Sequence, residues 1–175
     1  MKFTPAEDLE RRIPGSEIFA FLLVGLSIEL IQGMVVPDFL HADILLVLVI
    51  YVAAHGDPLK GAFVGTLFGM VQDYLVGVPV GLNGLTKAVI AFGASYLNRW
   101  TSTDLGSMRI VFIALLALVD RALILSILFL LGLHVSPLRP VDAVSSAILT
   151  GIVGEVFFRL YDKIRFPPKD FRRLD

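Results

Sequence analysis

Residues 59–76 read LKGAFVGTLFGMVQDYLV, an apolar segment in which glycines recur every four residues. We call the four regularly spaced residues Gly61, Gly65, Gly69 and Asp73, together with Gly77 directly after the segment, the glycine ridge. In an α-helix this spacing places all five on one face, and about 20 helical residues cross the hydrocarbon core of a bilayer. A face without side chains lets another helix approach closely, which is the packing that lipid favours. The segment therefore predicts a membrane helix that works by contact with another helix.

The whole chain has the composition of a membrane protein. Its 175 residues are 56% hydrophobic and their mean hydropathy is +0.80, too apolar for an ordinary soluble domain. The absence of cysteine excludes disulfides, thiolate metal sites and thiol nucleophiles. Residues 1–14 mix both charge signs and lack the apolar core of a signal peptide, so we expect the apolar stretch after them to be a retained first span.

Six apolar segments follow one another along the chain, separated by short connections that contain proline, glycine or charged residues. The segments cover residues 17–36, 39–54, 59–76, 80–97, 110–133 and 141–160. Proline and glycine in the connections end one helix and begin the next. We therefore predict an all-α protein with a six-helix transmembrane domain over residues 15–162, between cytoplasmic tails of residues 1–14 and 163–175. The second segment is short for a full crossing.

The distribution of basic residues predicts the orientation. Twelve of the 15 Lys and Arg residues lie at the two ends of the chain and in the second-to-third and fourth-to-fifth connections. On the opposite side only Arg139 is found, while Lys87 and Arg121 lie inside spans. Because basic residues favour the cytoplasmic side, both termini are expected to be cytoplasmic and the number of crossings even. The basic C-terminal tail is expected to lie on the anionic inner leaflet or to bind a cytoplasmic partner.

Several ionisable groups lie inside the predicted spans, where each needs a partner because an unpaired charge is costly in the bilayer. They are Glu29, Asp73, Lys87, Asp120, Arg121 and Glu155. We predict that Lys87 pairs with Asp73 or Glu29. The neighbours Asp120 and Arg121 point about 100° apart on a helix, so they need different partners. An ion or substrate path would align such groups along one route, and their scatter over five helices instead favours structural pairing.

The last span repeats the small-residue pattern in weaker form. Ala143, Ala147, Gly151 and Glu155, which we call the second ridge, recur every four residues, and Glu155 can pair with Arg159 one turn later. Each ridge is explained either by close packing within the chain or by a helix from another protein. The matching places of the third and sixth spans also suggest an internal repeat of two three-helix halves.

Motifs for catalysis and metal binding are missing from the sequence. The three histidines, His41, His55 and His134, are far apart, and no HExxH, G-x-S-x-G, phosphate-loop or dinucleotide motif is present. Asp38 and Asp43, which flank the entry to the second segment, are interpreted as residues of a solvated loop. We therefore predict no enzyme activity, no metal and no cofactor.

A more specific pattern covers residues 37–87. It consists of Pro37-Asp38, Asp43 before an apolar run that ends at Tyr51, the ridge glycines Gly61, Gly65 and Gly69, Gln72-Asp73, Gly77 and Gly81. This pattern resembles MreD, the family of small integral membrane components of the bacterial rod-shape system. The resemblance implies a noncatalytic scaffold of the bacterial cytoplasmic (inner) membrane that maintains rod shape. It also implies an MreC-type single-span partner and a direct or indirect link to the cell-wall elongation synthase and to MreB filaments.

The resemblance further implies a bundle similar to the substrate-binding subunits of energy-coupling-factor vitamin transporters, which are the main alternative. In those subunits long outer loops usually help to enclose the vitamin. The outer connections here, at residues 37–38 and 77–79, are very short, which favours a scaffold over solute capture. The expected mechanism is docking of a partner's transmembrane helix on the glycine ridge, with Asp73 as a polar anchor. Self-association through the same surface is the other use left open.

Overall fold

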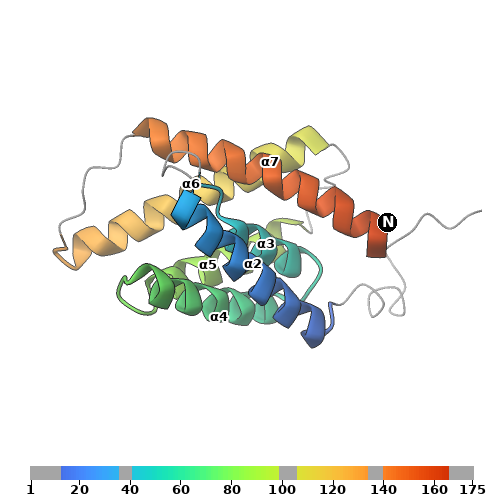
Figure 1. Ribbon diagram of the computed structural model, residues 1–175, viewed down its shortest axis with the longest axis horizontal. Coiled ribbons are helices and arrows are strands. Elements are labelled where there is room, and N and C mark those ends of the chain that lie inside the picture. Colours follow the sequence, from blue (N-terminus) through green and yellow to red (C-terminus); the bar gives the residue numbers. More distant parts are fainter. Residues whose placement is uncertain (1–12, 36–40, 99–105, 134–139, 166–175) are drawn as a thin grey trace, which may run out of the picture.

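The structure is a computed structural model that describes residues 13–35, 41–98, 106–133 and 140–165. These residues form six helices and no strand (Figure 1). The helices are α2 (Gly15–Val35), α3 (Ile44–Ala54), α4 (Pro58–Val76), α5 (Leu82–Asn98), α6 (Gly106–Leu130) and α7 (Pro140–Arg165). Each predicted apolar segment matches one helix, so the all-α class is confirmed. Most of the two predicted tails, residues 1–12 and 166–175, lies outside the described residues.

Three helices in the described ranges are long and apolar enough to cross a membrane. They are α2, α6 and α7, whose apolar stretches comprise 21, 25 and 25 residues. Large apolar side chains on these helices point outward, and Phe19, Val111 and Val141 are 62%, 67% and 74% exposed. Exposed apolar surface on this scale is typical of a bundle surrounded by lipid. The chain is therefore a transmembrane protein, while six crossings and cytoplasmic termini stay predictions.

The short helix α3 is the centre of the bundle. Every residue from Leu45 to Ala53 is buried, with at most 2% of its surface exposed. Helix α3 packs against α2, α4, α5, α6 and α7, and Figure 1 shows it enclosed by the longer helices. A helix that is apolar on all sides is stable when its whole circumference is buried. Burial on all sides therefore explains why the second segment is apolar throughout. It also explains why 11 residues suffice for a helix at this position.

Helices α4 and α5 form a closely packed pair joined by a short turn. Gly77 ends α4 with a φ of 73°, in the left-handed region that favours glycine, and its N–H donates to the carbonyl of Asp73. Gly81, with a φ of 102°, precedes α5. Gly77 is exposed, and a Cβ atom placed on it would have no neighbouring atom within 4 Å. It therefore shapes the turn and does not contribute to a helix-packing face.

The rest of the glycine ridge is covered by the chain's own helices. A Cβ atom on Gly65 would lie 2.6 Å from the backbone oxygen of Lys87, and one on Gly69 would overlap the backbone of Asn83. At Gly61 it would lie 3.1 Å from the Cα of Ala53. The ridge thus seats α5 and α3 with backbone against backbone. The predicted partner-helix interface is therefore corrected: Gly61, Gly65, Gly69 and Asp73 are covered by the chain's own helices, and Gly77 lies exposed in the turn.

The second ridge is also used inside the chain. A Cβ atom on Gly151 would lie 2.6 Å from the backbone oxygen of Ile110 in α6. Ala147 and Glu155 are buried, and Ala143 is half-buried. Of the two explanations for this ridge, close packing within the chain holds, since it joins α7 to α6.

Candidate functional site

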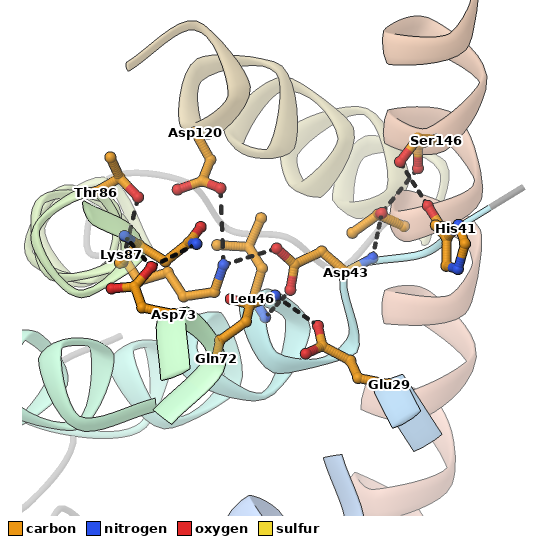
Figure 2. Close-up of polar contacts among 12 residues, drawn as sticks. Glu29, His41, Asp43, Leu46, Gln72, Asp73, Thr86, Lys87, Asp120 and Ser146 are labelled. Atoms are coloured by element: carbon orange, nitrogen blue, oxygen red, sulfur yellow. Dashed lines mark hydrogen bonds and ion pairs between the residues drawn. The ribbon is translucent and has the colours of Figure 1, made fainter. Parts of the chain in front are cut away.

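A cluster of charged side chains surrounds the N-terminal end of α3 (Figure 2). Its centre is Lys87 of α5, whose side chain is fully buried. The Lys87 ammonium donates to Oδ2 of Asp43 at 2.7 Å and lies 3.8 Å from Oδ2 of Asp120 in α6. Burial of a charge requires such partners. The prediction that Lys87 has a carboxylate partner inside the bundle is therefore confirmed. The partners are Asp43 and Asp120, so the predicted partners Asp73 and Glu29 are wrong.

Asp43 connects three helices at this point. Its side chain accepts the backbone N–H of Leu46 at 2.7 Å and so caps the start of α3. Its own backbone N–H donates to the Thr150 hydroxyl of α7 at 3.1 Å. Only 14% of its side chain is exposed, so the interpretation of Asp43 as a solvated loop residue is wrong. Two features of the sequence indicate this role of Asp43. An aspartate directly before an apolar helix is a typical N-cap residue, and Lys87 inside a predicted span needs a carboxylate partner.

Asp73 serves the turn between α4 and α5. It is fully buried, and its carboxylate accepts the backbone N–H groups of Gly81 at 2.7 Å and Asn83 at 3.0 Å. The Asn83 side-chain amide donates to it at 2.8 Å. A carboxylate at this position satisfies the N–H groups left open at the start of α5. Asp73 is therefore a helix cap inside the chain and not an anchor for a partner.

Helix α2 is attached to the cluster by side-chain amides. The Gln72 amide of α4 donates to Oε1 of Glu29 at 2.8 Å. Oε1 of Gln32 accepts the backbone N–H of Ala42 at 3.2 Å. Glu29 is thus paired with a neutral amide, and it shares the cluster with Lys87 without forming the predicted ion pair. These contacts fix the distal half of α2 beside the start of α3.

A cavity of about 570 Å³ adjoins the cluster. Residues of α2, α4, α5, α6 and α7 line it, together with the segment before α3. The charged residues in its wall are Glu29, Asp43, Asp120, Asp142 and Arg121. Its size is in the range of small-molecule sites. Arg121 thus lines the cavity. That it pairs with a partner other than that of Asp120 stays a prediction.

A second polar cluster lies at the other end of α3, where α2, α6 and α7 meet it. The Tyr51 hydroxyl donates to Asp162 at 2.8 Å, and Arg109 lies 4.0 Å from the same carboxylate. Arg109 also lies 3.5 Å from Glu155, which pairs with Arg159 at 2.5 Å as predicted. Rings surround these groups in edge-to-face contacts. The pairing of Tyr51 with Asp162 does not follow from the sequence, since 111 residues separate them.

The comparison with known proteins identifies the family of the chain. The family model described as rod shape-determining protein MreD matches residues 10–164. These residues contain both polar clusters and the cavity, and they extend the resemblance of residues 37–87 to most of the chain. No curated protein and no solved structure matches the chain, and nothing supports the alternative of a vitamin-transporter subunit. The chain therefore belongs to the MreD family of rod shape-determining membrane proteins.

Proposed function

We propose that this chain is a noncatalytic scaffold of the rod-shape system in the bacterial inner membrane, and that it holds an MreC-type single-span protein. Its family supports the role in rod-shape determination. The observation that carries the scaffold role is the fully buried helix α3, which all five other helices of the described ranges contact. Polar clusters at both ends of α3 tie these helices together. A helix bundle held together in this way keeps its apolar outer surface in one shape, which suits the binding of a partner helix.

The partner's helix has to lie on this exterior, because the glycine ridge is filled. Site-specific photo-crosslinking can test this with probes at exposed and buried positions of the purified complex. Probes at Phe19 of α2 and Val111 of α6, both more than 60% exposed, cover two candidate faces. A probe at Phe68, which is 1% exposed beside the ridge, is the matched buried control. We expect adducts to the MreC-type partner from an exposed position and none from Phe68.

Co-purification provides the primary test of the proposed function. The tagged chain, extracted in mild detergent, should retain an MreC-type partner that is co-expressed with it. Cells depleted of the chain should lose rod shape, and a plasmid copy should restore it. Failure of both co-purification and crosslinking would overturn the partner assignment. A crosslink from Phe68 alone would return the partner to the ridge.

The proposed topology of six crossings with cytoplasmic ends is open to a direct test. Because the chain has no cysteine, single-cysteine variants report one position each. Val80 in the α4–α5 turn and Leu59 at the start of α4 are 64% and 79% exposed. In intact spheroplasts a membrane-impermeant maleimide should label V80C, whereas L59C should react only after permeabilisation. The opposite pattern would invert the orientation, and labelling of both would exclude an odd number of crossings between them.

A further inference from the structure

We propose that Arg121, in the wall of the cavity beside α3, binds the carboxylate of a small organic acid that has an apolar part. The inference goes beyond the scaffold role. Arg121 belongs to the stretch of α6 that is long and apolar enough to cross a membrane, and it lines the cavity of about 570 Å³. A cation inside a membrane bundle is costly unless an anion accompanies it, and such residues commonly mark binding sites. The group that supplies the countercharge of Arg121 therefore identifies the class of ligand.

The first basis is that Arg121 has no direct partner in the described part of the chain. Its guanidinium forms no hydrogen bond and no ion pair there, whereas the arginines of the cluster at the other end of α3 each pair with a carboxylate. Its charge interacts at longer range with Glu29 and Asp43, which belong to other parts of the wall, so the charge lies at the cavity and not at the lipid surface. The N–H donors of the guanidinium therefore remain available to a group that enters the cavity.

The second basis is that the carboxyl groups of the wall are engaged elsewhere. Two of the four share the buried ammonium of Lys87, and a third accepts the amide of Gln72 at 2.8 Å. The fourth, Asp142, lies in the first turn of α7, where the positive end of the helix dipole stabilises a carboxylate. Among the described wall residues, Arg121 is thus the charged group that lacks compensation. The ligand that completes this wall is therefore an anion.

The third basis is the match between a carboxylate and this wall. A guanidinium binds a carboxylate through two parallel hydrogen bonds, and one negative charge balances one arginine. A phosphate monoester would bring nearly two negative charges at neutral pH. Ile124 and Leu128 continue the face of Arg121 along α6, and Val76 and Val78 also line the cavity. An inorganic anion would leave these apolar side chains without contact, whereas an acid with a short hydrocarbon chain would cover them.

The test is calorimetric titration of the purified full chain in nanodiscs of phosphatidylcholine, which has no net charge. Three probes of equal chain length are compared: hexanoate, n-hexanol and n-hexylammonium. We expect saturable binding of hexanoate, roughly tenfold tighter than that of n-hexanol, and none of n-hexylammonium. Equal affinity for hexanoate and n-hexanol would overturn the proposal, because it would leave only apolar partition into the cavity. Loss of hexanoate binding in phosphatidylglycerol nanodiscs, in high salt that screens their surface charge, would also overturn it, since a lipid phosphate would then occupy Arg121.

Variants of Arg121 locate the binding. Arg121→Gln should weaken hexanoate binding roughly tenfold, as expected for loss of a charged hydrogen-bond partner. Arg121→Lys keeps the charge but loses the paired donors of the guanidinium, so its affinity should be intermediate. Lys163→Gln is the matched control, since it removes a charge at an exposed position of α7 outside the cavity wall, and it should bind like the parent.

A fourth variant tests the cavity itself. Ala143 lines it, so Ala143→Leu should reduce its volume and weaken hexanoate binding while Arg121 stays in place. This variant decides the case if Arg121→Gln does not fold. Binding that is unchanged in Ala143→Leu, or in a folded Arg121→Gln, would overturn the proposal. Co-purification of an MreC-type partner is measured on the same variants, so that loss of ligand and loss of partner are distinguished.

Discussion

The two ends of helix α3 carry similar polar groups but differ in the free volume beside them. At the C-terminal end, the hydroxyl of Tyr51, two arginines and two carboxylates pair with one another among packed rings. The void beside them measures about 20 Å³, room for about one water molecule. At the N-terminal end, Lys87 is buried between two carboxylates, but a cavity of about 570 Å³ adjoins them.

This difference separates a tightly packed end from one with free volume. Polar groups that are all satisfied in a packed environment stabilise one arrangement of helices. We therefore assign both ends of α3 to holding the bundle together, and the larger free volume to the N-terminal end. Each of the following predictions tests one side of this assignment.

The largest effect is expected from Lys87→Met. The substitution leaves Asp43 and Asp120 as neighbouring buried carboxylates without a cation, and breaking a buried pair in this way costs about 3–5 kcal/mol. We expect a strong fall in the yield of monodisperse protein and in its midpoint of thermal unfolding in detergent. Lys163→Met, at an exposed position of α7, is the matched control and should unfold like the parent. A parent-like midpoint for Lys87→Met would contradict a holding role for the N-terminal cluster.

An intermediate effect is expected from adding volume at the two ends. Ala94 is 1% exposed and lines the small void, whereas Ala143 lines the large cavity. Ala94→Leu should destabilise the fold by about 1–3 kcal/mol, as overpacking of a filled core does. Ala143→Leu should cost much less, because its side chain has free volume to enter. Chemical unfolding of both variants measures the difference, and equal losses would show that the N-terminal end is as tightly packed as the other.

The sequence is sufficient to predict the helices, because apolar runs between prolines and glycines leave few other structures open to the chain. It also predicts that buried charges have partners, and the local pair Glu155–Arg159 follows from i, i+4 spacing alone. The partner of Lys87 cannot be predicted from spacing in this way. Its identity depends on the central position of α3, which brings Asp43 against α5, and 44 residues separate the two.

The glycine ridge shows a second limit of the same kind. A spacing of four identifies the face of α4 that accepts a close neighbour, and that part of the prediction agrees with the contact to α5. The spacing is the same whether the neighbouring helix belongs to this chain or to another protein. It therefore does not determine which of the two packs against the ridge. The cavity is still less visible in the sequence, since its wall combines residues from Glu29 to Ser146 and exists only after the helices pack.

The smallest effect is expected from Tyr51→Phe at the C-terminal end of α3. The variant keeps the ring contacts with Phe21 and Phe157 and removes only the hydrogen bond to Asp162. Arg109 and His55 remain within 4.0 Å of that carboxylate, so the loss should be about 1 kcal/mol. Tyr74→Phe, at a position that is 79% exposed, should change the unfolding free energy by less than the error of the same denaturant titration. A loss as large as that of Lys87→Met would contradict this ranking of the two ends of α3.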